Sequence, residues 1–210
     1  MIQINHLTKS FGSAIVLNDV SLTWESGMIH GLVGQNGSGK TVLLKCICGL
    51  MRYDAGEILI NDKQVGKDIE MPPDLGVIIE NPGFIQRMTG YNNLKILAEI
   101  RKKISDDRIR ETMTLVGLDW KSRKPVSHYS LGMKQRLGIA QAIMENPSLL
   151  IFDEPFNGLD KNGTKEIQKL FRELMQTGKT IILVSHNPLD ISEMCNTVVE
   201  IDAGIIRKRS

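Results

Sequence analysis

The sequence predicts an α/β fold in which helices cover both faces of a mostly parallel sheet. Short apolar runs at 149–152, 181–184 and 197–201 have the composition of strands that are buried on both faces. A helical pattern of apolar residues, spaced i, i+3, i+4, i+7 and i+8, separates the first two runs. The residues of this pattern are Ile167, Leu170, Phe171, Leu174 and Met175. Buried strands that alternate with helices are typical of a parallel sheet.

The first 33 residues alternate in the manner of strands, with a turn at residues 25–27. A glycine-rich break at 34–39 follows, and a helix is predicted over Thr41 to Leu50. Two further strands are expected at 57–60 and 75–79, after which the character of the chain changes.

From about residue 89 to residue 144 the pattern is helical. Leu94, Leu97 and Ala98 share one face of a first helix. Ile109, Met113 and Val116 share one face of a second helix, and a third helix runs on from Ser130. We therefore expect a single domain over residues 1–210, with a helical subdomain inserted at about 85–145.

Composition limits the possible functions. A net charge of +2 over 210 residues gives no reason to expect nucleic acid as a partner. No apolar run reaches the roughly 18 to 20 residues that span a bilayer, and the first residues do not resemble a signal peptide. Cys46, Cys48 and Cys195 form neither a disulfide framework nor a zinc spacing, so we expect buried thiols in a reducing cytosol.

Residues 34–41, Gly-Gln-Asn-Gly-Ser-Gly-Lys-Thr, fit the phosphate-loop pattern G-x-x-x-x-G-K-[ST]. The glycines let backbone N–H groups turn inward around phosphate oxygens, and the helix that begins near Lys40 adds its positive end. Lys40 is predicted to reach the β and γ phosphates of a nucleotide, and the Thr41 hydroxyl to bind Mg²⁺. The loop alone does not decide between kinases, GTPases and ATPases.

Two carboxylates, Asp153 and Glu154, directly follow the buried strand at 149–152, at the edge where α/β proteins place ligands. Adjacent acids repel each other unless a cation is present. Asp153 is predicted to hold Mg²⁺, mostly through water, and Glu154 to accept a proton from the water that attacks the γ phosphate. The alternative is a solvated strand end, which the phosphate loop makes less attractive.

His186 closes the next apolar strand. A lone histidine at a strand end is more often structural than catalytic. Parallel strands beside the phosphate loop, however, deliver their ends to one edge of the sheet. We therefore predict that His186 has a catalytic role.

Residues 129–136 read Tyr-Ser-Leu-Gly-Met-Lys-Gln-Arg, and Ser130 is a good N-cap whose following N–H groups form an anion site. With the motifs above, this stretch resembles the ATP-binding domain of ABC transporters, whose signature is L-S-G-G-Q. The chain keeps four family positions: Ser130, Gly132, Gln135 and Arg136. It departs from the family at Tyr129, Leu131 and Met133.

This resemblance implies a P-loop NTPase fold of the ABC type, with an N-terminal antiparallel β subdomain beside the core sheet. It also implies a head-to-tail dimer with a second nucleotide-binding domain. There, Ser130 and Gly132 grip the γ phosphate held by the other subunit. If this stretch lies in the inserted lobe, far from residues 34–41, a domain cannot use it on its own nucleotide. The loop at 157–160 matches the family's contact with that subunit, and His186 matches the family's switch histidine.

The resemblance assigns the remaining site residues. Phe11 matches the aromatic residue that stacks on adenine, Val42 replaces a usual hydroxyl, and Glu80 replaces a usual glutamine. Catalytic roles fall on Lys40, Glu154 and His186, and metal binding falls on Thr41, Glu80 and Asp153. ATP-binding roles fall on Phe11, Gly34, Asn36, Gly37, Ser38, Gly39, Lys40, Thr41, Val42, Ser130 and Gly132.

Glu80 and the form of the signature are similar to the branch that handles bacitracin and lantibiotic peptides. The predicted function is an ATP-hydrolysing subunit, cytoplasmic and peripheral at the membrane, that powers a separate transmembrane permease. That permease is expected to dock at residues 81–93. The alternatives are a soluble ABC ATPase in cofactor or cluster assembly, or a DNA-repair or chromosome ATPase, which would need long coiled coils or zinc inserts between Lys40 and Asp153. If Glu80 is not a metal ligand, it pairs with a basic residue such as Arg87 or one on the permease.

Overall fold

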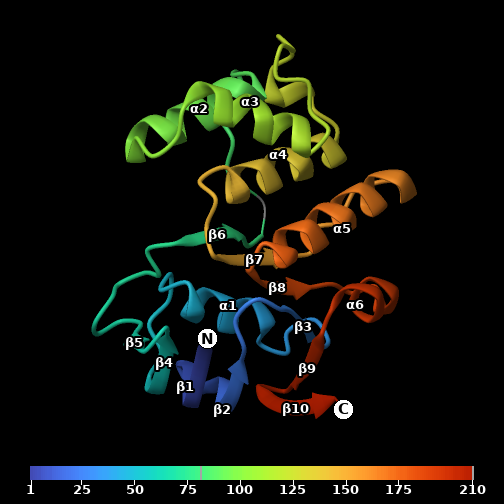
Figure 1. Cartoon of the computed structure of the whole chain (residues 1–210). Coiled ribbons are helices and arrows are strands. Elements are labelled where there is room, and N and C mark those ends of the chain that lie inside the picture. The colour runs from blue at the N-terminus through green and yellow to red at the C-terminus, as the bar shows by residue number, and fades with distance from the viewer. Residues whose placement is uncertain (81, 210) are drawn as a thin grey trace.

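The computed structural model describes residues 1–80 and 82–209, which form two sheets and a separate lobe of helices (Figure 1). The larger sheet has the strand order β10-β9-β3-β8-β7-β6. Its strands are β3 (Ile29–Val33), β6 (Leu75–Ile78), β7 (Leu149–Asp153), β8 (Thr180–Val184), β9 (Thr197–Asp202) and β10 (Ile205–Arg209). All neighbouring pairs in it are parallel except β9 and β10, so the predicted mostly parallel sheet is confirmed.

The smaller sheet is antiparallel and has the order β2-β1-β4-β5. Its strands are β1 (Ile2–Phe11), β2 (Ala14–Trp24), β4 (Ala55–Ile60) and β5 (Lys63–Gln64). The turn between β4 and β5 is made by Asn61 and Asp62, both with positive φ. A two-residue hairpin turn needs this conformation to match the right-handed twist of its two strands. The predicted N-terminal antiparallel subdomain is therefore present.

Two layers of helices cover the larger sheet. Helix α1 (Lys40–Ile47) lies between the two sheets, whereas α5 (Lys161–Gln176) and α6 (Pro188–Met194) cover the opposite face. The alternation along β8 shows this directly. Ile181 and Leu183 belong to the core under α5, and Ile182 and Val184 to the core around α1. Both faces of β8 are buried, as its continuous apolar run predicts.

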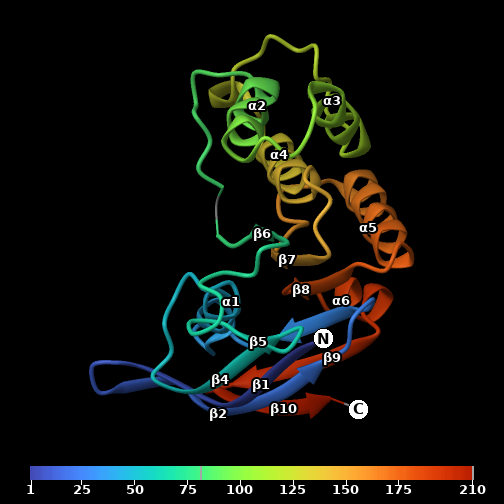
Figure 2. The ribbon, with the colours of Figure 1, turned by 60° about the vertical axis from the view of Figure 1, so that its left-hand side comes forward.

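The helical lobe stands away from the smaller sheet, above the edge of the larger one (Figure 2). It contains α2 (Gly90–Arg101), α3 (Asp106–Leu115), a 3₁₀ turn (Val126–His128) and α4 (Leu131–Ile143). Helix α4 packs against β6 so closely that a Cβ at Gly76 would lie 2.0 Å from the backbone oxygen of Ala142. The lobe is thus fixed to the edge strand of the core sheet. Asn81, the first residue of the expected docking segment, lies outside the described residues.

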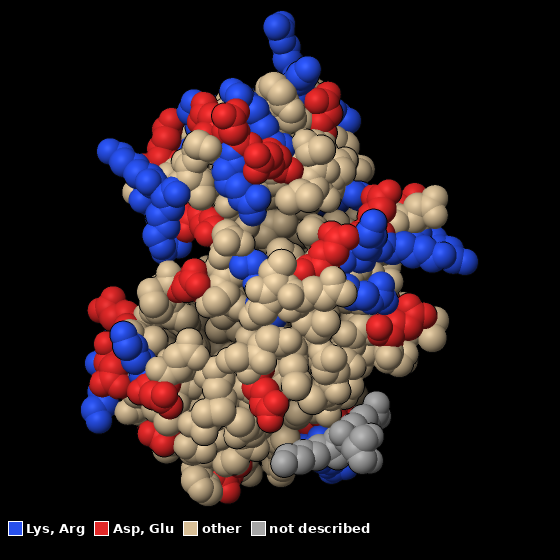
Figure 3. All heavy atoms as spheres, in the orientation of Figure 1, with Lys and Arg blue, Asp and Glu red and all other residues tan. Residues whose placement is uncertain are grey.

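Basic and acidic side chains are intermingled over the face of the molecule shown in Figure 3, and no continuous basic surface is visible there. Among the described residues, no helix is both long enough and apolar enough to cross a membrane.

Candidate active site

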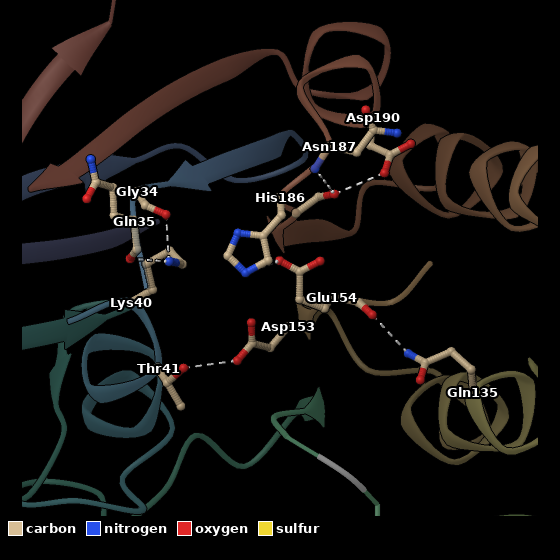
Figure 4. Close-up of polar contacts among 11 residues, drawn as sticks. Gly34, Gln35, Lys40, Thr41, Gln135, Asp153, Glu154, His186, Asn187 and Asp190 are labelled. Atoms are coloured by element: carbon tan, nitrogen blue, oxygen red, sulfur yellow. Dashed lines mark hydrogen bonds and ion pairs between the residues drawn. The ribbon is translucent and has the colours of Figure 1, made fainter. Parts of the chain in front are cut away.

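Three parallel strands end side by side at one edge of the larger sheet, and each delivers predicted site residues there (Figure 4). The phosphate loop follows β3, the two carboxylates end β7, and His186 follows β8. The order β3-β8-β7 places the histidine between the loop and the acids. The predicted convergence of these motifs is confirmed for the residues that Figure 4 labels.

The phosphate loop has the backbone of an anion site. Its last residue, Gly39, has φ of 106° and caps α1, and the amides of residues 36, 37 and 39 donate no hydrogen bond within the described part of the chain. Gly34 is required by close approach, because a Cβ there would lie 2.2 Å from the backbone oxygen of Ile201. The loop therefore presents unpaired N–H groups at a helix N-terminus, which is the arrangement that binds phosphate.

Lys40 bends back over this loop. Its Nζ donates to the backbone oxygens of Gly34, at 2.7 Å, and Gln35, at 2.8 Å. Burial lowers the pKa of Lys40, and the charges of Asp153 and Glu154 oppose that shift. A phosphate in the loop would offer the ammonium group a stronger, charged acceptor than these carbonyls.

Asp153 faces the start of α1. The Thr41 hydroxyl donates to Asp153 Oδ2 at 3.2 Å, so the two predicted magnesium ligands are already in contact. Burial raises the pKa of Asp153, against the lowering effects of the Thr41 hydrogen bond and the Lys40 charge. A hydroxyl beside a carboxylate is a donor set that suits a hard cation such as Mg²⁺.

Glu154 leaves β7 with φ of 53°, a left-handed conformation that is unfavourable for a residue with a side chain. Its backbone oxygen accepts from Gln135 Nε2 at 3.3 Å, and its backbone amide donates to Val184 O at 3.0 Å. These contacts join the turn to α4 and to β8. They hold the carboxylate toward the cleft in a conformation the chain would not adopt alone.

The Glu154 carboxylate has an oxygen whose hydrogen-bonding capacity is unused. Burial raises its pKa, and the neighbouring backbone and ring of His186 act in the opposite direction. His186 Nε2 lies 3.3 Å from Glu154 Oε1, but Oε1 is buried and has no hydrogen-bond partner in the described structure. A buried acceptor without a donor, beside a histidine, fits a group that accepts a proton from a bound water.

A cleft of about 640 Å³ joins these groups. Predicted site residues in its wall are Asn36, Gly37, Gly39, Lys40, Thr41, Val42, Glu80, Asp153, Glu154 and His186. Sequence reasoning gave no pocket role to Val16, Leu131, Gln135 or Asn157, which also line it. Of these, Leu131, Gln135 and Asn157 lie in motifs that the sequence singled out, and Val16 does not.

The other predicted nucleotide-binding residues do not line this cleft. Phe11 is 49% exposed at the end of β1, with Lys9 Nζ 5.4 Å from its ring centroid. Ser130 caps α4 by accepting from the Met133 amide at 3.2 Å, which confirms the predicted N-cap. At Gly132 a Cβ would lie 2.6 Å from the backbone oxygen of Gly158, so a glycine fits between α4 and the 157–160 loop.

Glu80 lines the cleft from the turn after β6, with φ of 61°. Its carboxylate accepts from Lys45 Nζ at 2.6 Å, so Glu80 pairs with a basic residue, as the alternative held, but that residue is Lys45 and not Arg87. Lys45 lies on α1, 35 residues before Glu80, and no local sequence pattern marks such a pair. Within the described residues, no group of three or more His, Cys, Asp or Glu side chains is arranged to hold a metal ion.

Residues 17–157 of the chain match the family model described as ABC transporter. This chain belongs to the ABC transporter family. The sequence-based predictions of the family, of its fold and of an ATPase of the ABC type are thereby confirmed.

Curated relatives of this ABC protein are named as transport ATP-binding proteins. It is 42% identical over 97% of its length to the uncharacterized ABC transporter ATP-binding protein YybJ of Bacillus subtilis, and covers 94% of that protein. It is 40% identical to the bacitracin transport ATP-binding protein BcrA of Enterococcus faecalis, over 94% of this chain and 65% of BcrA. It is 33% identical to the lantibiotic transport ATP-binding protein SrtF of Streptococcus pyogenes, over 98% of this chain and 89% of SrtF. The predicted resemblance to proteins of these two kinds is confirmed.

A solved structure of an ATP-binding subunit of an ABC transporter superimposes on the whole chain with a TM-score of 0.88, at 26% sequence identity and over 89% of that structure. The similarity therefore extends over the helical lobe as well as the sheets.

Proposed function

We propose that this ABC protein hydrolyses ATP at the described cleft and thereby powers a separate transmembrane subunit. The observation that carries the proposal is the meeting of three groups at one sheet edge. A loop with unpaired backbone N–H groups faces a carboxylate whose Oε1 has no hydrogen-bond partner in the described structure, and the ring of His186 lies 3.3 Å from that oxygen. The loop supplies a phosphate site and the carboxylate a proton acceptor, as phosphoryl transfer to water requires.

Each residue has a distinct role in this proposal. The loop amides and the Lys40 ammonium would bind the β and γ phosphates of ATP and draw off charge from the transferred group. Glu154 would accept the proton of the attacking water, for which a raised pKa and an unoccupied acceptor atom are suitable. His186, 3.3 Å from Glu154, would orient that carboxylate and contact the γ phosphate.

Mg²⁺, when it is bound with the nucleotide, neutralises charge on the phosphates. Thr41 and Asp153 would hold it, and the hydrogen bond between them already places their two oxygen ligands 3.2 Å apart. Glu80 lines the same cleft and is a candidate third ligand, although its carboxylate is paired with Lys45 in this structure.

We also propose that two such chains associate head-to-tail. Ser130 caps the exposed N-terminus of α4 and, like Gly132, stands outside the wall of the cleft. A helix N-terminus of this kind attracts an anion, and the γ phosphate of a second subunit would supply one. Phe11, exposed at the end of β1, would be free to stack on adenine.

The transported substrate is inferred from the relatives. BcrA and SrtF are named for bacitracin and lantibiotic transport, so we propose a peptide antibiotic as cargo, in export or self-protection. In that role the chain would lie in the cytoplasm, at the inner face of the membrane, bound to its permease.

Release of phosphate from ATP by the purified protein tests the enzymatic part. The wild-type protein should hydrolyse ATP, and Lys40→Ala should abolish this because it removes the cation at the γ phosphate. Glu166→Gln, which removes only the exposed carboxylate of the Arg136 ion pair on α5, serves as a control for loss of a surface charge. Absence of ATP hydrolysis by the wild-type protein, both alone and with a co-purified membrane chain, would refute the proposal.

A further inference from the structure

Asp190 lies on the side of His186 away from Lys40 (Figure 4) and belongs to a network of buried polar side chains. Ser185, Asp190 and Gln168 expose 7%, 5% and 6% of their surface, and they come from three different elements. Ser185 follows β8, Asp190 lies on α6, and Gln168 lies on α5. This network of hydrogen bonds therefore connects the end of β8 to α5 and α6, the two helices that cover this face of the sheet.

Asp190 is the centre of this network. Its Oδ2 accepts from the Ser185 hydroxyl at 2.9 Å, and its Oδ1 accepts from Gln168 Nε2 at 3.2 Å. The Ser185 oxygen in turn accepts from the backbone amide of Asn187 at 3.1 Å. Both hydrogen-bonding capacities of the hydroxyl are thus in use, and its rotation is fixed.

The two residues held in this way flank His186 directly. Because Ser185 and the Asn187 amide are joined to each other and anchored to Asp190, the backbone of His186 has little freedom to rotate. Its ring is 53% exposed and lies 3.3 Å from Glu154 Oε1, so burial of the ring does not fix its position. The position of the ring therefore depends on the backbone, and the backbone depends on Asp190.

Stability alone does not explain a carboxylate at position 190. In the described structure Asp190 forms no ion pair, and neutral donors alone satisfy it. A buried carboxylate of this kind is a poor source of folding free energy compared with an apolar side chain of similar size. What it does provide is two acceptor oxygens in fixed directions, one toward α5 and one toward the strand end.

We propose that Asp190 is a positioning residue for ATP hydrolysis, acting through Ser185 and Asn187 to hold His186 against Glu154. The proposal rests on the proposed function, in which His186 contacts the γ phosphate. The alternative is a purely structural role, in which Asp190 only helps α6 to pack.

Steady-state ATPase kinetics and NMR of the histidine rings separate these roles. Asp190→Ala should lower kcat by about 10- to 100-fold while the KM for ATP changes less than about twofold, because a misplaced group affects the reaction more than binding. Asp190→Asn should retain kcat within about threefold, since an amide still accepts from Ser185 and can bond to Gln168 after that side chain rotates. The chain has four histidines, so the His186 ring resonance can be assigned with His186→Ala. That resonance should move in Asp190→Ala and stay in Asp190→Asn.

Lys179→Met is a matched control at the opposite end of β8. Lys179 is 8% exposed and, like Asp190, makes two side-chain hydrogen bonds, to the backbone oxygens of Asn146 and Pro147. Its loss should lower stability, and both kcat and the His186 resonance should stay unchanged. If Asp190→Ala does not fold, Gln168→Leu, which removes one donor, should give the same resonance shift with a kcat loss of a few-fold.

Three results would overturn the proposal. The first is an unchanged His186 resonance in Asp190→Ala, and the second is a kcat of Asp190→Ala within twofold of the wild-type value. The third is an Asp190→Asn variant whose kcat is as low as that of Asp190→Ala. The proposed function fails separately. If His186→Ala retains wild-type turnover, His186 has no role in hydrolysis, whatever the Asp190 variants show.

Discussion

Replacing Glu154 with glutamine should make the nucleotide-free protein more stable while it nearly abolishes ATP turnover. The side chain is 19% exposed, and its buried Oε1 has no hydrogen-bond partner in the described structure. Burial raises the pKa of this carboxyl despite the attraction of His186 and Lys40, so desolvation of the charge outweighs the favourable pairs. A glutamine has the same shape and no charge, and it removes the repulsion from Asp153.

The magnitude follows from the charge, because glutamine keeps a polar atom at the same place. Two like charges a few ångströms apart near a protein surface repel each other by about 1 to 4 kcal/mol, and we take the lower end because the cleft is open to water. A stabilisation of about 1 kcal/mol raises the Tm of a chain of this size by about 2 to 4 °C. The backbone strain at position 154 is the same in both proteins and cancels. Turnover should fall by about 10²- to 10⁴-fold, the usual contribution of a positioned proton acceptor.

The pH dependence gives this prediction a sign that can be checked. A carboxyl whose pKa is raised by folding favours the folded state when it is protonated, and that advantage is lost as pH rises through the folded-state pKa. The Tm difference between Glu154→Gln and wild type should therefore be small at acid pH and largest at neutral pH. Thermal unfolding followed by circular dichroism without nucleotide measures it. A wild-type protein that is equally stable at neutral pH, or a difference that grows on acidification, would contradict the reasoning.

Three further predictions concern other parts of the site and core. Mixing a Lys40→Ala chain with a Ser130→Arg chain should restore part of the ATPase activity that each lacks alone, because one composite site then has both residues; heterodimers without activity would contradict the head-to-tail arrangement. Glu80→Gln should leave an active ATPase that needs several-fold more Mg²⁺ for half-maximal rate, since one damped charge is worth about 1 kcal/mol there; an unchanged Mg²⁺ titration would leave Glu80 with only its ion pair. Burial raises the pKa of Cys46 to about 11 and of Cys48 to about 12, so iodoacetamide at pH 8 should not modify them until urea unfolds the protein, as mass spectrometry would show.

The sequence predicted the core of the site because its signals are local. A loop of spaced glycines, a strand ending in two acids and a strand ending in a histidine are each visible within a few residues, and parallel pairing of β3, β8 and β7 does the rest. The parallel pairing places these three motifs side by side at one edge of the sheet. The helical lobe was visible for the same reason, since its apolar period is that of a helix.

Contacts between distant residues were not predictable in this way. Lys45 and Glu80 are 35 residues apart, and Gln168 and Asp190 are 22 apart, with no repeat that would relate them. Such pairs depend on how α1, α5 and α6 pack onto the sheet, which apolar periodicity does not specify to the nearest side chain. The position of Phe11 is a related case. The family resemblance assigns it to the adenine, but Val16 and not Phe11 lines the cleft in this structure.

Two neighbouring parallel strands of the core, β6 and β7, are each followed by a glutamate in the left-handed conformation, Glu80 at φ 61° and Glu154 at φ 53°. Each such residue is strained by roughly 1 to 2 kcal/mol relative to ordinary backbone. Both carboxylates line the cleft with Asp153, whose pKa is raised mainly by burial and, to a smaller extent, by the charge of Glu80. The fold thus places three acids at one strand edge at the expense of backbone strain, desolvation and mutual repulsion. A cation that enters with a nucleotide would relieve the repulsion, so the proposed Mg²⁺–ATP complex should stabilise this edge where the protein alone does not.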